Sequence, residues 1–200
     1  MYYLILDTSS KIGFVALFHH QTALSIKMIP SMDLSKDLMQ AIESVFSSNG
    51  LSPSDIDFIA CGVGPGSFTG TRIGIISAKA LSYTLNIPVV DFCSLIAFFP
   101  ENPPHQFTLV ADAKTKQVYQ IHFDHFNKEH PFSDVQLTPI SSIENAPSTY
   151  LIDESLAPFL NKANKTTLNI SYLSQYVTER FSKKIFLNSQ ELKPIYLKTP

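Results

Sequence analysis

The sequence has no tryptophan, only two arginines and only seven glycines, none of them after Gly74. It contains no low-complexity tract and no run of about 18 apolar residues, the length that a membrane span needs. The first ten residues carry no basic group and reach Asp7 after a short apolar stretch, which makes a poor secretion signal. We therefore expect a globular, cytoplasmic protein that does not contact a membrane.

Cysteine and net charge are also scarce. Cys61 and Cys93 lie in apolar stretches, a placement more typical of small buried side chains than of a disulfide or a metal site. Fifteen basic and seventeen acidic residues give a net charge of −2, which offers little attraction for nucleic acid. Residues 151–200 carry seven basic and four acidic groups, an excess that a solvated surface explains.

What the sequence does have is an alternation of strand-like and helix-like segments. Residues 2–18 predict a hairpin, and residues 34–48 carry apolar side chains at helical spacing. An apolar, strand-length run at 58–64 precedes a helix predicted from Ile73 to about Asn86, with a further strand at 87–92. Three prolines among residues 100–104 predict a boundary between an N-terminal subdomain, 1–103, and a C-terminal subdomain, 104–200, whose last segment could pack back on the first.

A weak internal repeat supports this division. Residues 4–18 align without a gap on residues 109–123, so that Asp7 matches Asp112 and Phe18 matches Phe123. Two unrelated hairpins would also explain the match. The repeat favours an α/β chain of two related subdomains, each beginning with a strand, an Asp-bearing turn and a second strand.

Five of the seven glycines lie between Gly62 and Gly74. No glycine there precedes a lysine, as a Walker loop requires, and the dinucleotide fingerprint fails by one residue in either register. What remains is a strand, a turn and a helix N-terminus, which could bind an anion or could serve packing alone. The turn is the motif loop Gly64, Pro65, Gly66, Ser67, Phe68 and Thr69, in which Ser67 or Thr69 is the candidate helix cap.

Small residues recur every four positions after this loop, at Gly70, Gly74 and Ala78. They predict a helix ridge that lets another element approach closely, either the helix of Leu38 and Ile42 or a second chain. A bulky residue at Gly74 is then expected to block a partner and leave the fold intact. Arg72, between the glycines, could bind a carboxylate or a phosphate.

These residues carry a family resemblance. The stretch "GVGPGSFTGTRIG", together with "LILDTS" before it, "ADAKTKQVY" at 111–119 and "KPIYLK" near the end, resembles the TsaB (YeaZ) family of bacterial tRNA threonylcarbamoyladenosine biosynthesis proteins. The resemblance implies a duplicated actin/hexokinase-like, ribonuclease H-like α/β fold with a reduced second subdomain. The sequence departs from the family pattern at Leu34, Thr71 and Ala80.

The resemblance also implies a function without chemistry of its own. Members of the family pair with TsaD, the catalytic subunit that modifies adenosine 37 of tRNA, and with the ATPase TsaE, and they form homodimers when alone; tRNA is contacted only through the complex. The dimer helices correspond to residues 35–47 and 70–85. The implied interface comprises Leu38, Ile42, Gly70, Arg72, Ile73, Gly74, Ser77, Ala78 and Leu81.

No catalytic, metal or cofactor site is expected. TsaD binds metal partly through an H-x-x-x-H pair, whereas residues 32–42 contain no histidine. His122, His125 and His130 fall on opposite faces of a predicted strand. Asp7 and Asp112 occupy the places of the two phosphate loops of this fold, but neither turn has the usual glycine, so both positions are interpreted as vestigial. The alternative function is a small ATP-dependent phosphotransferase of the same fold.

Overall fold

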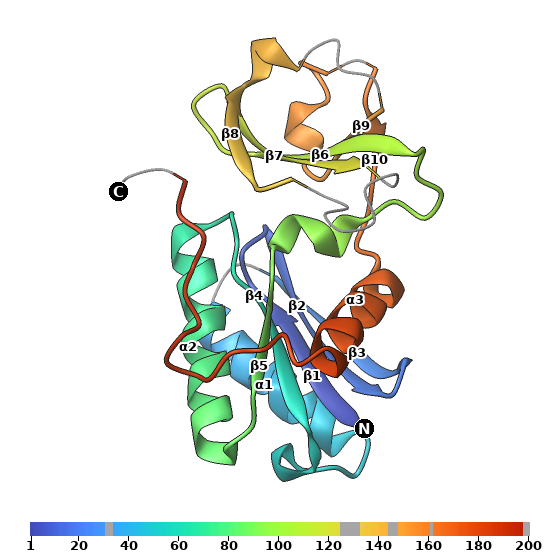
Figure 1. Cartoon of the computed structure of the whole chain (residues 1–200). Coiled ribbons are helices and arrows are strands. Elements are labelled where there is room, and N and C mark those ends of the chain that lie inside the picture. Colours follow the sequence, from blue (N-terminus) through green and yellow to red (C-terminus); the bar gives the residue numbers. More distant parts are fainter. Residues whose placement is uncertain (31–33, 125–132, 144–147, 161, 198–200) are drawn as a thin grey trace. The chain divides into compact units, whose positions relative to one another are not determined.

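The computed structural model describes residues 1–30, 34–124, 133–143, 148–160 and 162–197 (Figure 1). The elements are, in chain order, β1 (Tyr2–Asp7), β2 (Ile12–His19), β3 (Thr22–Pro30), α1 (Leu34–Ser47), η1 (Pro53–Asp55), β4 (Phe58–Gly62), α2 (Phe68–Leu85), β5 (Val89–Phe92), η2 (Ser94–Phe98), β6 (Gln106–Asp112), β7 (Gln117–Asp124), β8 (Gln136–Pro139), η3 (Ile140–Ser142), β9 (Thr149–Leu151), η4 (Glu154–Leu156), β10 (Asn164–Lys165) and α3 (Ile170–Ser182), where η denotes a short 3-10 helix. No helix in the described ranges is long and apolar enough to cross a membrane.

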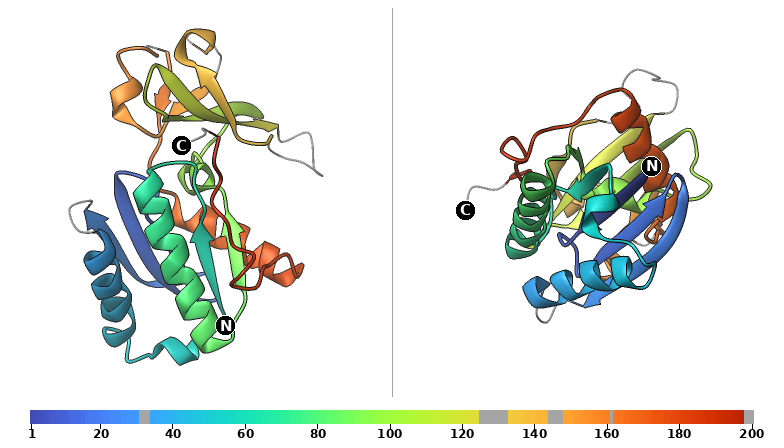
Figure 2. Two further views of the ribbon diagram at one scale, coloured as in Figure 1. Left: turned by 90° about the vertical axis from the view of Figure 1, so that its left-hand side faces the viewer. Right: turned by 90° about the horizontal axis from the view of Figure 1, so that it is seen from below.

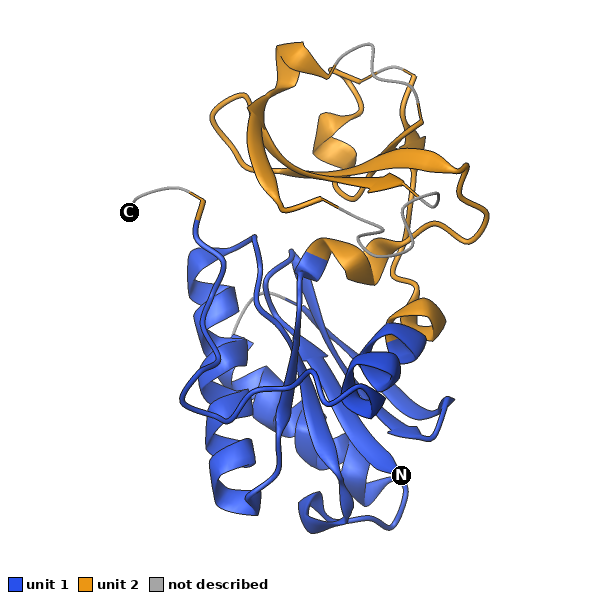
Figure 3. Ribbon diagram, in the orientation of Figure 1, with its two compact units in different colours: residues 1–94, 174–196 blue, residues 95–173, 197–200 orange. Residues whose placement is uncertain are grey.

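The chain divides into two compact units (Figure 3). Unit 1 comprises residues 1–94 and 174–196, and unit 2 comprises residues 95–173 and 197–200. Unit 2 thus begins before the predicted boundary after residue 103, because Phe99 packs its ring against Phe107, Phe123 and Tyr172 of unit 2. The chain returns to unit 1 at residue 174, so that residues 174–196, in the last part of the chain, belong to the first unit.

The sheet of unit 1 has the strand order β3-β2-β1-β4-β5. Strands β1, β4 and β5 are parallel, and β2 and β3 are antiparallel neighbours. Helices α1 and α2 lie against one face of the sheet and α3 against the other, as the views in Figure 2 show. Because both faces are covered, the central strands β1 and β4 are apolar and buried along nearly their whole length.

Unit 2 has the same strand order read from the opposite end, β8-β7-β6-β9-β10, with the same pattern of parallel and antiparallel pairs. The hairpin of β6 and β7 corresponds to that of β1 and β2, as the internal repeat predicts. The duplicated fold class is confirmed. The gapless alignment is wrong by one residue, since Asp7 pairs with Phe14 but Asp112 pairs with Val118, and the second turn is therefore one residue shorter.

The second unit is reduced, as expected. The connection between β4 and β5 contains the 18-residue helix α2, whereas in the described part of the connection between β9 and β10 the only helix is η4, of three residues. The described residues 154–160 form this short 3-10 helix and the turn that follows it. Strands β3 and β10 were not predicted at all, because β3 is largely exposed and β10 has two residues.

Candidate functional site

The glycine-rich loop lies at the carboxyl edge of the unit 1 sheet, where ligands of α/β proteins usually bind. Here β1 ends at Asp7, β4 at Gly62 and β5 at Phe92, and the following segments meet. The amide of Ser67 donates to the carbonyl of Ser9 at 2.6 Å, and the Thr8 hydroxyl donates to the carbonyl of Gly70 at 2.7 Å. The turn after β1 is thus bonded directly to the start of α2.

Glycine is required at four positions of this loop and helix because residues 7–9 pack against them and leave no room for a Cβ. A Cβ at Gly62 would overlap the Asp7 carboxylate, and a Cβ at Gly70 would overlap the Thr8 carbonyl oxygen. At Gly66 it would overlap the Ser9 carbonyl oxygen, and at Gly74 it would lie 2.6 Å from Thr8 Oγ1. The glycines serve packing within the chain, because residues 7–9 occupy the space beside them.

This packing corrects two expectations about the small-residue ridge. Gly70, Gly74 and Ala78 are buried within unit 1, and the two glycines face the turn after β1, not a second helix or a second chain. A bulky residue at Gly74 would therefore collide with Thr8, so it cannot be assumed to leave the fold intact.

Helix α2 begins five residues earlier than predicted, at Phe68. Ser67 is its N-cap, since the Ser67 hydroxyl accepts from the amide of Gly70 at 3.2 Å. Glycine and threonine in the first turn hid this start from propensity arguments. Within the motif loop, Gly64 and Pro65 are buried, whereas residues 66–69 are exposed.

The Asp7 carboxyl is closed off from solvent. It is 3% exposed, and its Oδ1 accepts from the amide of Ser9 at 2.7 Å. Burial raises the pKa of Asp7, and hydrogen bonds from Ser94 and Ser9 only partly offset this effect. The Asp7 carboxyl thus closes its own turn after β1 and fills the space beside Gly62.

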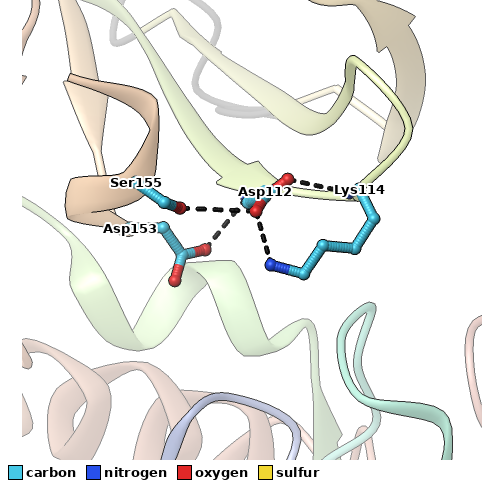
Figure 4. A network of polar contacts seen from close by, with 4 residues as sticks. All are labelled: Asp112, Lys114, Asp153 and Ser155. Atoms are coloured by element: carbon cyan, nitrogen blue, oxygen red, sulfur yellow. Dashed lines mark hydrogen bonds and ion pairs between the residues drawn. The ribbon is translucent and has the colours of Figure 1, made fainter. Parts of the chain in front are cut away.

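Asp112, at the equivalent position of unit 2, is engaged differently (Figure 4). The Lys114 ammonium donates to Asp112 Oδ2 at 2.6 Å, the Lys114 amide donates to Oδ1 at 2.8 Å, and the Ser155 hydroxyl lies 3.3 Å from Oδ2. The amide of Asp112 donates to Asp153 Oδ2 at 2.9 Å. Burial raises the pKa of Asp112, but the bonds from Lys114 outweigh it and hold that pKa below its usual value.

The predicted interface residues separate into two groups. Leu38 and Ile42 on α1 are buried, as are Gly70, Gly74 and Ala78 on α2. Ile73, Ser77 and Leu81 are half-buried, and Arg72 is exposed. The buried five hold α1 and α2 against the sheet, so only the other four could contribute to a contact surface.

An exposed apolar stripe on α2 was not identified from the sequence. Phe68, Ile76 and Tyr83 are 46%, 65% and 76% exposed, and Arg72 lies between the first two. Successive members of the set Phe68, Arg72, Ile76 and Tyr83 are four, four and seven residues apart, so all four lie on one face of the helix. The spacing is present in the sequence, but only the structure shows that this face of α2 is exposed and that the small-residue ridge lies on the opposite face.

A metal site is not formed by the described residues, in which no three His, Cys, Asp or Glu side chains gather. His122 lies 3.2 Å from the Thr108 hydroxyl through its Nδ1. His125 and His130 fall outside the described ranges. Cys61 is buried and Cys93 half-buried, without a disulfide.

Comparison with known proteins identifies the family. The family described as "TsaD: tRNA N6-adenosine threonylcarbamoyltransferase" matches residues 28–153, more than half of the chain. The chain is 30% identical over 120 residues to the tRNA threonylcarbamoyladenosine biosynthesis protein TsaB of Haemophilus influenzae, and 32% identical over 121 residues to that of Bacillus subtilis. It belongs to this family, in its TsaB (YeaZ) group.

The extent of these matches differs between sequence and structure. Both sequence matches cover 58% of this chain and about half of the relative, 51% and 52%. The solved structure of YeaZ from Pseudomonas aeruginosa superposes with a TM-score of 0.80 over 98% of this chain and 99% of that one, at 21% identity. The fold of that structure therefore covers nearly the whole chain, whereas the matches to the curated relatives cover little more than half of it.

Proposed function

We propose that this chain is a non-catalytic subunit of a cytoplasmic complex that makes threonylcarbamoyladenosine at position 37 of tRNA. In this proposal it binds a TsaD-type catalytic subunit, works with a TsaE-type ATPase and meets tRNA only through the complex. The observation that carries the proposal is the apolar stripe of Phe68, Ile76 and Tyr83 on a helix of a TsaB-family fold. Exposed apolar side chains that gather on one face of a helix are typical of interaction surfaces.

The closed carboxyl edge supports a role without catalysis. In a phosphotransferase of this fold the aspartates at the Asp7 and Asp112 positions would face a nucleotide. Here Asp7 is buried under Gly62, and Asp112 is bonded to Lys114. Each carboxylate therefore already has internal partners, and a nucleotide would have to displace them.

The docking surface that we propose consists of the outward faces of α1 and α2, which lie side by side (Figure 2). It contains the α2 stripe and Met39 of α1, which is also half exposed. A second copy of the chain could use the same faces when TsaD is absent, because a helix pair with an apolar outer face is self-complementary across a two-fold axis. Homodimer and heterodimer would then exclude each other.

The test is Ile76→Glu, which places a charge at the centre of the stripe without entering the core. We expect binding to the TsaD-type subunit from the same organism to weaken by at least about a hundredfold, since the charge would be desolvated at the interface. Ile12→Glu on β2, where the isoleucine is 54% exposed, is the matched control. Calorimetry and size-exclusion chromatography with light scattering measure both variants.

Unchanged binding of Ile76→Glu would contradict the docking surface. A wild-type chain that fails to bind the TsaD-type subunit, with or without the TsaE-type ATPase and Mg-ATP, would contradict the function itself. In that case, tight binding of Mg-ATP to the isolated chain would favour the phosphotransferase alternative.

A further inference from the structure

The last described segment of unit 1, residues 187–196, is an extended strap that runs along α2 (Figures 1 and 2). Leu187 exchanges two backbone hydrogen bonds with Val89 of β5, at 2.8 and 2.9 Å. Leu192 is fully buried in the core beneath α2, and the amide of Ile195 donates to the carbonyl of Val63 at 2.8 Å. The strap is thus fixed at three points before it reaches Tyr196.

Tyr196 ends the strap in a contact with the first turns of α2. Its ring stacks on Phe68, with centroids 5.5 Å apart, and its hydroxyl accepts from Arg72 Nε at 2.7 Å. The Arg72 guanidinium carbon lies 3.7 Å from the centroid of the Phe68 ring. One face of the guanidinium is therefore against a ring and its Nε edge is occupied, although all three side chains remain largely exposed.

This contact leaves the other edge of Arg72 available. Among the described residues, no acceptor is bonded to the terminal nitrogens Nη1 and Nη2 of Arg72. Two parallel N–H groups on a planar, immobilised guanidinium match the two oxygens of a carboxylate. Because the arginine is held before it binds, less side-chain entropy is lost when a partner docks.

We propose that the strap presets Arg72 as a bidentate donor to a carboxylate on the docking protein, with Tyr196 as the positioning residue. The inference rests on the proposed function. The partner would need an apolar surface that contacts Phe68, Ile76 and Tyr83, and an aspartate or glutamate within hydrogen-bond distance of Arg72. The C-terminal strap is then part of the docking surface, although it lies more than one hundred residues from α2 in the chain.

The charges on α2 favour a protein carboxylate over a nucleic-acid phosphate. The helix has no acidic residue, and its two basic residues are Arg72 and Lys79. Lys79 Nζ is 3.4 Å from the carbonyl oxygen of Gln190 on the strap. Tight binding to a nucleic acid requires several phosphate contacts from lysine and arginine, whereas one arginine beside an apolar stripe is typical of a protein interface.

The test is a double-mutant cycle in the full chain, with calorimetric affinity for the TsaD-type subunit as the readout. Tyr196→Phe keeps the ring on Phe68 and removes only the acceptor for Arg72 Nε. We expect it to weaken binding by about fivefold, and Arg72→Lys by about tenfold or more, as for hydrogen bonds to charged groups. In the Arg72→Lys background, Tyr196→Phe should change the affinity less than about twofold, because lysine has no Nε donor. Tyr119→Phe on β7 is the matched hydroxyl deletion.

A second readout needs no partner. In the isolated chain, the Nε proton of Arg72 should exchange slowly with water by nitrogen-15 NMR, and Tyr196→Phe should accelerate the exchange. An exchange rate that Tyr196→Phe does not change overturns the inference, whatever the binding data show. Equal weakening by Tyr196→Phe with and without Arg72→Lys also overturns it, since this would be a structural effect of the strap.

The remaining outcomes separate this inference from the proposed function. If the wild-type chain does not bind the TsaD-type subunit, both are overturned. If Ile76→Glu abolishes binding while Arg72→Lys and Tyr196→Phe leave it unchanged, only the inference is overturned. Loss of tRNA binding in Arg72→Lys with unchanged affinity for the protein partner would assign Arg72 to a phosphate and overturn the choice of a carboxylate.

Discussion

The turns after β1 and β6 occupy the same place in two sheets of the same strand order, yet they are stabilised by opposite means. In unit 1, Asp7 is buried, and glycines at positions 62, 66, 70 and 74 let the start of α2 close over the turn. In unit 2 there is no glycine, and Asp112 is held by Lys114 and Ser155. In unit 1, close backbone packing joins the turn to the long helix α2. In unit 2, the turn is held by ionic contacts, and the described part of the connection after β9 contains only the short helix η4.

The largest difference between the two turns should come from a methyl group added where α2 closes over the turn of unit 1. Gly70→Ala should destabilise unit 1 by about 3 kcal/mol, because the new Cβ overlaps the backbone of Thr8 and the backbone yields less than a side chain. Gly50→Ala is the control: it has open space but a φ of +64°, so strain alone should cost about 1 kcal/mol. Urea unfolding measures both, and equal losses would contradict the packing role of Gly70.

The two aspartates should respond to pH with opposite signs. The folded-state pKa of Asp7 is raised, so its contribution to stability is present below the unfolded value of 3.8 and is lost as the pH rises through the folded value. The folded-state pKa of Asp112 is lowered, so its contribution is present above that value and is lost as the pH falls.

Substitution of each aspartate by asparagine sharpens this contrast. Asp7→Asn should remove a loss of stability that develops as the pH rises above about 4. Asp112→Asn should remove a gain of stability that develops as the pH rises from about 2 to about 5, on either side of the unfolded pKa. Unfolding free energies at several pH values, with hydrogen exchange to assign the change to each unit, provide the measurement. A pH dependence that changes in the same direction in both variants would contradict the opposite pKa shifts of Asp7 and Asp112.

The smallest expected effect lies in the turn of unit 2, where Lys114, Thr115 and Lys116 all have positive φ. Such conformations are strained for residues with a Cβ. Lys116→Gly should stabilise unit 2 by about 0.5–1 kcal/mol, the strain relieved minus the entropy gained by the unfolded chain. A loss of thermal stability in this variant would contradict the strain argument, and Lys11→Gly in the corresponding turn of unit 1 serves as the comparison.

Much of unit 1 could be predicted from the sequence. The hairpin, the apolar strand β4, the helix of Leu38 and Ile42 and the internal repeat all depend on local periodicity, which residues show directly. Strand β3 could not be predicted because its exposed residues do not alternate with buried ones. The start of α2 could not be predicted because glycine and threonine are poor helix formers.

The fold class, the internal repeat and the resemblance to the TsaB family can be inferred from the sequence, because each depends on the order and spacing of residues. The role of the glycines and the outward side of α2 become clear only once the chain is folded. Those answers depend on residues far apart in the chain: Thr8 lies against Gly70, and Tyr196 lies against Arg72. A helical ridge of small residues can face its own sheet or a partner. Which of the two it faces depends on whether another part of the same chain packs against it.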